Sequence, residues 1–453
     1  MSDMIGAVST ALAPSGIGVI RLSGAGCAEA ADRILSPVQG TPLSRAEPRK
    51  LRLYDLRDRK GRVMDRILAV RTPGPNSYTG EDTVELQCHG SPAVLAEALA
   101  NLFAQGVRQA LPGEFTKRAF LNGRMDLTAA EAVIDLIEAE TADAAANAAG
   151  QLGGALLRRL EPVYNALVGL MSHFHAVLDY PDEDIDDFSL GEYRSLLEAQ
   201  RDTLTALLAT ADRGRVVKHG VRAVILGCPN AGKSSLLNAL AGYDRVIVTP
   251  VPGTTRDTVE ESVRMGSILL RLTDTAGIRE TADQVEKLGV DRSLAAVREA
   301  DLALLVIDGS TPLTEEDRQA MAAAKNAKRC VCVLSKTDLA QVICPEDLDF
   351  ETVIPLSSVT GTGLDALTRR VEVMFASDLP CDGGLLTNLR QETAIRAAQD
   401  AISRTLDSLA AGATPDAVLL DVEEALEAMA GLLGTSMRED ITNDIFSRFC
   451  VGK

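Results

Sequence analysis

One short stretch constrains the fold of this chain more than any other: residues 227–235 read Gly-Cys-Pro-Asn-Ala-Gly-Lys-Ser-Ser. The apolar run 221–226 comes directly before it, so a buried strand is expected to lead into the loop. The spacing Gly-x-x-x-x-Gly-Lys-Ser is that of a P-loop, whose glycines let backbone N–H groups turn toward a phosphate. Lys233 can reach the β- and γ-phosphate oxygens, and the Ser234 hydroxyl can ligate Mg²⁺. The stretch therefore predicts a nucleotide site.

Three later segments indicate which nucleotide binds. Residues 274–277, Asp-Thr-Ala-Gly, follow the apolar stretch 268–272; an Asp there can hold Mg²⁺ through water, and a Gly N–H can meet the γ-phosphate. Residues 335–338, Ser-Lys-Thr-Asp, follow a strand expected at 330–334, and Asp338 can accept hydrogen bonds from guanine N1–H and the exocyclic amine. Ser357 and Ser358 follow another apolar stretch and would complete the base pocket. The order and spacing resemble those of translation-factor-type GTPases.

The guanine motif departs from its usual form at the first position, which carries Ser335 in place of Asn. A shorter hydroxyl can replace only part of the hydrogen bonding of an amide. We therefore expect GTP to be preferred over ATP, with a lowered affinity. Residues 335–338 taken alone could equally be an ordinary turn after a strand, and the ordered series of motifs favours the guanine site.

Length and charge limit the class of protein. A chain of 453 residues is too long for one compact core, so two or three domains are expected. No apolar run reaches the roughly 18 residues of a membrane span, and the first 21 residues lack the pattern of a signal or transit peptide. We expect a cytoplasmic protein with no membrane partner. The net charge of −18 argues against a general nucleic-acid binder, so RNA contact requires a local basic patch or a partner protein.

The cysteines do not indicate a metal site. There are eight of them with four histidines, and none forms a Cys-x-x-Cys pair. Neither a zinc site nor a disulfide framework is expected. Cys330 and Cys332 alternate within an apolar strand and are expected to pack as small hydrophobic side chains.

Composition along the chain predicts a multidomain α/β and α+β protein. Residues 1–118 mix short strands (19–22, 67–70 and 83–86) with turns and a helix near 93–105, which is typical of an α+β domain. Residues 119–216 and 376–453 are rich in helical periodicity, and 217–375 alternate strands and helices as in a doubly wound sheet. The simplest arrangement is a P-loop GTPase domain inserted in one α-helical domain.

Four separated stretches resemble one known family. They are residues 74–82 (Gly-Pro-Asn-Ser-Tyr-Thr-Gly-Glu-Asp), 112–122 (Pro-Gly-Glu-Phe-Thr, then Arg-Ala-Phe-Leu-Asn from 118), 253–257 (Gly-Thr-Thr-Arg-Asp) and the terminal 449–453 (Phe-Cys-Val-Gly-Lys). Over nearly its whole length the chain is similar to the bacterial tRNA-modification GTPases called MnmE or TrmE.

The resemblance implies a homodimer formed through the N-terminal domains, working with the flavoprotein MnmG (GidA). The pair would add an aminomethyl-type group, commonly carboxymethylaminomethyl, to carbon 5 of the wobble uridine of tRNA. The one-carbon donor would be 5-formyltetrahydrofolate or a related tetrahydrofolate, held in the 1–118 domain. The family's folate contacts fall on Arg21, Glu85, Arg124 and Lys453; position 124 usually carries Lys, so Arg124 keeps the charge with a different geometry. Without the resemblance, each of these could be a solvated charge or a surface ion pair.

Hydrolysis needs a group that positions water, and the residue after Gly277 is Ile278, which cannot replace the Gln of Ras-like enzymes. By resemblance a Glu farther along takes part, and it maps to Glu286. Its carboxylate could orient water directly or through a second water, or it could simply cap the start of a helix. Cys450 could act as a thiol nucleophile on the uridine, or it could order the tail by packing.

The resemblance also implies a bound K⁺ in place of an arginine finger. Asn230 would offer a side-chain oxygen, and Thr249, Val251 and Thr254 main-chain or hydroxyl oxygens; Asn230 could otherwise be only a loop residue that tolerates unusual dihedrals. Ser234 and Thr255 are the expected Mg²⁺ ligands. The full set of expected GTP-binding residues is Asn230, Ala231, Gly232, Lys233, Ser234, Ser235, Thr249, Pro250, Val251, Pro252, Gly253, Thr254, Thr255, Asp274, Thr275, Ala276, Gly277, Ser335, Lys336, Thr337, Asp338, Ser357 and Ser358.

Two other functions compete with tRNA modification. One is a ribosome-assembly GTPase, although such proteins generally append a basic RNA-binding module that this chain lacks. The other is a regulatory switch with negligible hydrolysis, which the missing Gln suits and which Asn230 and Glu286 oppose. The folate-domain stretches and the terminal Cys-Val-Gly-Lys favour the tRNA-modification GTPase.

Overall fold

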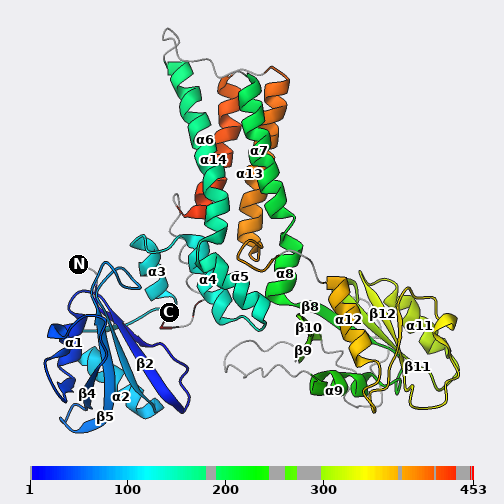
Figure 1. Cartoon of the computed structure of the whole chain (residues 1–453), viewed down its shortest axis with the longest axis horizontal. Coiled ribbons are helices and arrows are strands. Elements are labelled where there is room, and N and C mark those ends of the chain that lie inside the picture. Colours follow the sequence, from blue (N-terminus) through cyan, green and yellow to red (C-terminus); the bar gives the residue numbers. More distant parts are fainter. Residues whose placement is uncertain are drawn as a thin grey trace, which may run out of the picture. The chain divides into compact units, whose positions relative to one another are not determined.

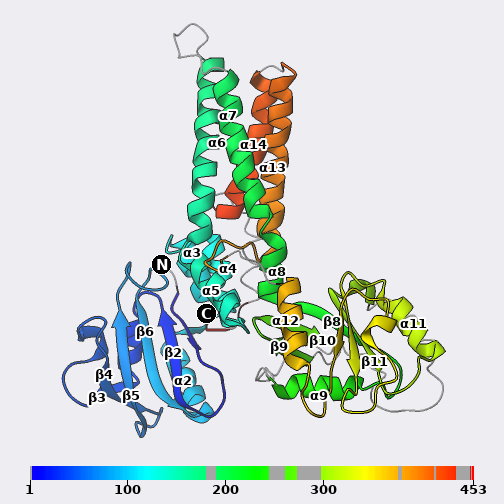
Figure 2. The same cartoon turned by 45° about the vertical axis from the view of Figure 1, so that its right-hand side comes forward.

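The computed structural model describes most of the chain, in two compact units that we treat separately (Figures 1 and 2). The first unit comprises residues 1–134, 151–193 and 400–453, and the second comprises 135–150 and 194–399. The residues described are 3–179, 190–243, 261–272, 297–375, 380–412, 415–434, 449 and 451–452.

The first unit contains a seven-stranded sheet of order β3-β4-β5-β6-β2-β1-β7 (Figure 2). Neighbouring strands are antiparallel, except that β1 and β7 are parallel. The strands expected within 19–22, 67–70 and 83–86 are confirmed as parts of β2, β5 and β6. The strands are β1 (Ile5–Val8), β2 (Ser15–Ser23), β3 (Leu35–Pro37), β4 (Arg52–Arg57), β5 (Val63–Thr72), β6 (Thr83–Gly90) and β7 (Arg108–Gln109).

Two helices, α1 (Cys27–Asp32) and α2 (Pro92–Ala104), cover one face of this sheet, and the helix expected near 93–105 is confirmed as α2. Every second strand residue points into that core because side chains alternate across a pleated strand. The core joins Leu95 and Leu102 of α2 to strand residues on the same face, which are Ile20, Leu22, Tyr54, Leu56, Ile67, Ala69, Val84 and Leu86.

Long helices make up most of the rest of the chain outside the second sheet. Within the first unit α6 packs along α14, and the two lie side by side in both views. The helical character expected of 119–216 and 376–453 is confirmed for the described residues of those ranges. The helices are α3 (Glu114–Leu121), α4 (Leu127–Ile137), α5 (Ala142–Leu152), α6 (Ala155–Asp179), α7 (Leu190–Leu208), α8 (Ala211–His219), α13 (Leu389–Ala410) and α14 (Pro415–Leu433).

The second unit holds a six-stranded sheet of order β13-β12-β11-β8-β10-β9. It is parallel except at β9, which pairs antiparallel with β10. Its strands and helices are β8 (Val221–Leu226), α9 (Lys233–Tyr243), β9 (Glu261–Met265), β10 (Ile268–Leu272), β11 (Leu302–Asp308), α11 (Glu315–Ala324), β12 (Cys330–Ser335), β13 (Val353–Pro355) and α12 (Leu364–Phe375).

The central strands of this second sheet are buried on both faces, which explains why β11 and β12 are nearly continuous apolar runs. In β11, Leu302, Leu304 and Val306 pack toward α9 and α12, whereas Ala303 and Leu305 pack toward α11. This is the doubly wound arrangement predicted from the sequence, and the multidomain α/β fold class is confirmed. Among the described residues, no helix combines the length and apolar character required to cross a bilayer.

Candidate active site

The loop after β8 has the backbone that a phosphate cradle requires. Gly227 has φ 142°, and a Cβ there would lie 2.3 Å from the Val306 carbonyl oxygen, so no other residue fits without movement of the sheet. Asn230 has φ 65° and Gly232 φ 103°. The alternation of left- and right-handed residues turns successive N–H groups to one side, which produces an anion-binding concavity.

Helix α9 begins at Lys233, directly after this loop, so its free N–H groups face the same concavity. The Lys233 Nζ donates to the carbonyl oxygens of Gly227 and Cys228, at 2.7 Å each. Burial lowers the pKa of Lys233. Ser234 and Ser235 are exposed on the first turn of α9. The loop therefore positions an ammonium, helix N–H groups and two hydroxyls around one small volume.

Ser335, the last residue of β12, contacts the P-loop. Its Oγ lies 2.6 Å from the Ala231 carbonyl oxygen and 3.0 Å from that of Ile307, and the side chain is buried. The hydroxyl thus connects the P-loop to the ends of β11 and β12. The sequence predicts a weakened base contact at Ser335, or an ordinary turn, whereas the described contacts of its hydroxyl are with the protein backbone.

The remaining base-pocket residues gather at the ends of β12 and β13. Asp338 is exposed, and its Oδ1 accepts a hydrogen bond of 2.6 Å from the Ser357 hydroxyl. The Thr337 N–H donates to the Leu356 carbonyl oxygen, and Ser358 follows as a half-buried residue. The structure therefore brings Asp338 and Ser357 together, as the order of the motifs predicts.

Lys336 takes no direct part in that contact. It has φ 58°, and its Nζ donates to Asp308 Oδ2 at 2.6 Å. Burial alone would raise the pKa of Asp308, but the hydrogen bonds from Lys336 and Ser310 hold it below its ordinary value. This ion pair fixes the turn that presents Asp338.

Several expected site residues lie outside the described residues. These include the first switch, the Asp-Thr-Ala-Gly segment, the water-orienting Glu and the terminal thiol and Lys. They are Thr249, Pro250, Val251, Pro252, Gly253, Thr254, Thr255, Asp274, Thr275, Ala276, Gly277, Glu286, Cys450 and Lys453.

The first unit holds a second cluster of expected site residues. Arg21 of β2 and Glu85 of β6 are cross-strand partners, and Arg21 Nε donates to Glu85 Oε1 at 3.0 Å. The guanidinium of Arg21 also lies over two rings, 5.2 Å from the centroid of Tyr78 and 5.9 Å from that of Phe115. Arg21 and Glu85 thus form an ion pair with each other, and the Glu85 side chain remains 34% exposed.

Arg124 is exposed and lies beside the loop formed by residues 74–82. A Cβ on Gly80 of this loop would come within 3.3 Å of Arg124 Cγ.

The loop 74–82 is held in place by a charge network. Glu81 Oε2 accepts a hydrogen bond of 2.9 Å from Arg118 Nη1 and one of 2.8 Å from the Ser23 hydroxyl. Tyr78, Glu81, Phe115 and Arg118 lie in the family stretches 74–82 and 112–122, and no role was predicted for them from the sequence.

The end of the chain packs on this sheet, within the first unit. Val451 forms a β-bridge with Pro112, and the Ser9 hydroxyl donates to the Gly452 carbonyl oxygen at 2.9 Å. Phe449 is buried against Ala130 and Val133 of α4. Gly452 has φ 102°, and a Cβ there would lie 2.3 Å from the Val8 carbonyl oxygen. Val8 follows Ala7, which pairs with Arg21, so the described tail residues lie against β1, the strand next to the one that holds Arg21.

Known proteins with the same organisation cover the whole chain. Residues 4–124 match the family described as GTP-binding protein TrmE N-terminus, and residues 127–450 match the MnmE helical domain. The tRNA modification GTPase MnmE of Roseiflexus sp. (strain RS-1) is 41% identical over 464 residues, which cover 100% of this chain and 99% of that protein. The protein of the same name from Carboxydothermus hydrogenoformans is 37% identical over 465 residues, with 100% of both chains covered.

Solved structures match a smaller share of the chain. The G domain of the T. maritima FeoB iron transporter is 30% identical, with 35% of this chain and 99% of that chain covered and a TM-score of 0.27, which is too low to bear on the fold. The two family matches and the full-length relatives leave no part of the chain unaccounted for. The chain belongs to the MnmE family of tRNA modification GTPases.

Proposed function

We propose that this protein hydrolyses GTP as part of the modification of carbon 5 of the tRNA wobble uridine, together with a flavoprotein partner of the MnmG (GidA) type. The observation that carries the proposal is the combination, in one chain, of a P-loop with an Asp338–Ser357 pair and a first unit in which the Arg21–Glu85 pair and the C-terminal tail belong to the same sheet region. A regulatory GTPase needs only the first of these.

Oxygen donors in the P-loop suit hard cations. The Ser234 hydroxyl is exposed on the first turn of α9, and we propose that it binds Mg²⁺ together with Thr255. The Asn230 side chain is exposed from a left-handed backbone position, and we propose that its oxygen contributes to a K⁺ site with Thr249, Val251 and Thr254. A K⁺ ion there would offset charge that develops on the phosphates, as an arginine finger does. We propose that Glu286 orients the water that attacks the γ-phosphate.

The potassium proposal makes a direct prediction about GTP turnover. In KCl, kcat should exceed its value in NaCl at least roughly tenfold, because charge on the phosphates is offset only when the ion fits the loop. Asn230→Gly should abolish this difference while GTP affinity stays within a few-fold. Glycine is the informative substitution because it removes the oxygen and still accepts φ 65°.

Asn230→Ala serves as the companion variant, since it also lacks the oxygen but strains the loop. Steady-state hydrolysis and nucleotide titration on the same samples separate the two effects. Equal turnover of the unaltered protein in KCl and NaCl contradicts the potassium site. Loss of the K⁺ response only in Asn230→Ala would assign the effect to loop strain.

For the first unit we propose a tetrahydrofolate site and a homodimer formed through that unit. The chemistry of the cluster suits a folate: Glu85 can accept from the pterin N–H edge with Arg21 paired to it at the same end, and Arg124 and Lys453 can meet the glutamate tail. The pairing of Arg21 with Glu85 also fixes the carboxylate orientation at the sheet surface. Folate supplies the one-carbon unit when bound.

Mass spectrometry of wobble nucleosides tests the tRNA function. Cells that lack this protein should lose the C5-aminomethyl-type modifications of wobble uridine, and re-expression should restore them. Unchanged wobble nucleosides, or a defect confined to ribosome assembly, would overturn the proposal and favour the ribosome-assembly alternative.

A further inference from the structure

Basic residues are concentrated in one segment of this acidic protein. Residues 45–71 contain ten of the 46 Lys and Arg residues and four of the 64 Asp and Glu residues. An even distribution of the cations would place about three in a segment of this length. We call residues 45–71 the basic segment. It comprises β4, β5, the hairpin between them and the stretch that leads into β4.

Three of the four carboxylates of the basic segment pair with a Lys or Arg of the same segment, and the fourth, Asp65, contacts the imidazole of His89. Glu47 pairs with Lys50, Asp55 with Arg66, Asp58 with Arg62, and Asp65 with His89. In the part of the chain that the structure describes, no carboxylate pairs with the remaining cations of the segment. These are Arg45, Arg49, Arg52, Arg57, Arg59, Lys60 and Arg71.

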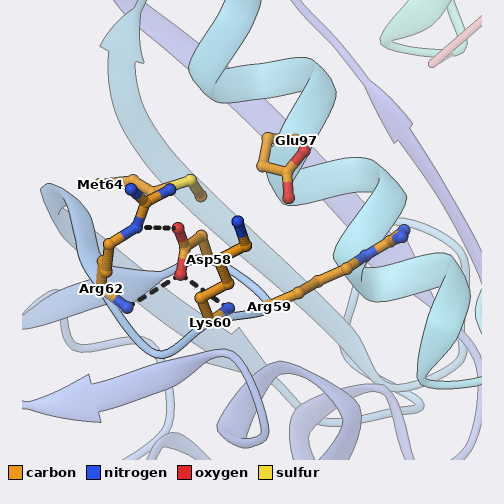
Figure 3. Close-up of a pocket in the computed structure, with 6 residues that line it drawn as sticks. All are labelled: Asp58, Arg59, Lys60, Arg62, Met64 and Glu97. Atoms are coloured by element: carbon orange, nitrogen blue, oxygen red, sulfur yellow. Dashed lines mark hydrogen bonds and ion pairs between the residues drawn. The ribbon is translucent and has the colours of Figure 1, made fainter.

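The hairpin tip is organised so that its cations face outward. Asp58 is nearly buried and accepts from the N–H groups of Lys60 and Arg62 and from Arg62 Nε, and these bonds lower its pKa. Figure 3 shows Asp58 at the centre of the turn with Arg62 and Lys60 around it. The Asp58 carboxylate therefore makes its hydrogen bonds within the turn, and the Lys60 side chain remains exposed.

Arg59 is held in place from outside the hairpin. Its Nη2 donates 2.7 Å to the Ala100 carbonyl oxygen near the end of α2, and Figure 3 shows the side chain extended beside that helix. The hairpin tip and α2 enclose a hollow of about 400 Å³, lined by Asp58, Arg59, Lys60, Arg62, Met64 and Glu97. Glu97 is exposed, and it is the only lining carboxylate outside the turn.

The composition of the basic segment indicates what it binds. Eight of its ten cations are arginines, whose planar guanidinium groups match phosphate oxygens in pairs. Its one aromatic residue, Tyr54, is buried in the core and cannot stack on a base. Such a surface contacts the phosphate backbone and does not read bases. The segment also exposes four apolar side chains that a protein partner could contact, which are Leu51, Leu53, Val63 and Leu68. The arginine forks outnumber them and match pairs of phosphate oxygens, which favours a polyphosphate over a protein partner.

We propose that the basic segment binds the phosphate backbone of tRNA, an inference that rests on the proposed function. The basic segment would give a chain of net charge −18 a local surface for RNA, although the chain has no appended basic domain. The contact is independent of base sequence, depends on salt, and is weakened by Glu97.

The test is tRNA binding by the full-length protein, measured by fluorescence anisotropy over a series of KCl concentrations. Arg59→Ala with Lys60→Ala should reduce affinity roughly tenfold or more at low salt and lower the slope of log Kd against log salt by about two. Glu97→Gln should increase affinity, a gain that a misfolded variant cannot give. Arg194→Ala with Arg318→Ala is the matched control, because it removes two exposed arginines elsewhere with the same change in net charge.

Each outcome decides the inference. If the unaltered protein binds no tRNA, the inference and the tRNA function both fail. If it binds tRNA and the Arg59/Lys60 variant binds equally well, the inference alone fails. A variant that keeps tRNA affinity but loses the flavoprotein partner would identify a protein-docking surface and overturn the RNA assignment. Equal loss in the control pair would show a general charge effect, which also overturns it.

Discussion

Deletion of Phe449 to Lys453 is expected to abolish the proposed wobble-uridine modification and to leave GTP hydrolysis, with its proposed K⁺ response, nearly intact. The contacts of the described part of this tail lie within the first unit: Val451 bridges Pro112, Gly452 accepts from Ser9, and Phe449 packs on α4. None of the GTP-site contacts described above involves the tail. Calorimetry with 5-formyltetrahydrofolate should show weakened binding, because Lys453 would be removed and Gly452 would no longer lie beside β1.

A smaller change separates tail position from protein stability. Loss of the buried Phe449 side chain is expected to lower the free energy of unfolding by about 3 to 5 kcal/mol. The deletion therefore needs a companion variant that keeps Phe449 in place. Gly452→Ala retains Phe449 but places a Cβ 2.3 Å from the Val8 carbonyl oxygen at φ 102°, so it should displace only the terminus. Val451→Ala is the control, because its bridge uses backbone groups.

The pattern of results identifies what the tail does. Folate affinity lost in Gly452→Ala and kept in Val451→Ala supports a terminus that completes the folate site. Undiminished folate affinity in the deletion would remove Lys453 from that site. A collapse of GTPase activity would mean that the tail instead stabilises the fold as a whole.

The strands and helices with a clear period were predictable from the sequence. Continuous apolar runs before the P-loop and before Ser335 became β8 and β12, since strands buried on both faces must be apolar throughout. The sequence analysis did not identify β4, Arg-Leu-Tyr-Asp-Leu-Arg, as a strand. Its charged residues alternate with only two core side chains, Tyr54 and Leu56, and a run that short resembles a polar loop.

The sequence indicates where candidate site residues lie when local spacing defines the segment, and it does not indicate the long-range contacts that position them. The Gly-x-x-x-x-Gly-Lys-Ser spacing alone defines the loop that contains Lys233. In contrast, the contact of Ser335 with Ala231 joins residues 104 positions apart, and no sequence period reports it. The same holds for the tail, where Ser9 and Gly452 are 443 positions apart.

Changing Asp338 to Asn is expected to reduce GTP affinity by roughly 10²-fold or more and to shift preference toward xanthine nucleotides. The carboxylate would lose two charge-assisted hydrogen bonds to guanine, each worth about 1.5 to 3 kcal/mol. An Asn amide can instead donate to the C2 carbonyl of xanthine while its oxygen accepts from N1–H. Competition titrations with GTP, XTP and ATP measure the change.

Ser357→Ala provides the matched control for this substitution. It removes the 2.6 Å hydrogen bond to Asp338 Oδ1 but keeps the carboxylate, so affinity for GTP should fall by less than about tenfold, with no gain for xanthine. The difference between the two variants isolates base recognition from the orientation of the side chain. Unchanged selectivity in Asp338→Asn would remove residues 335–338 from the base pocket, and Ser335 would then serve only to connect β12 to the P-loop.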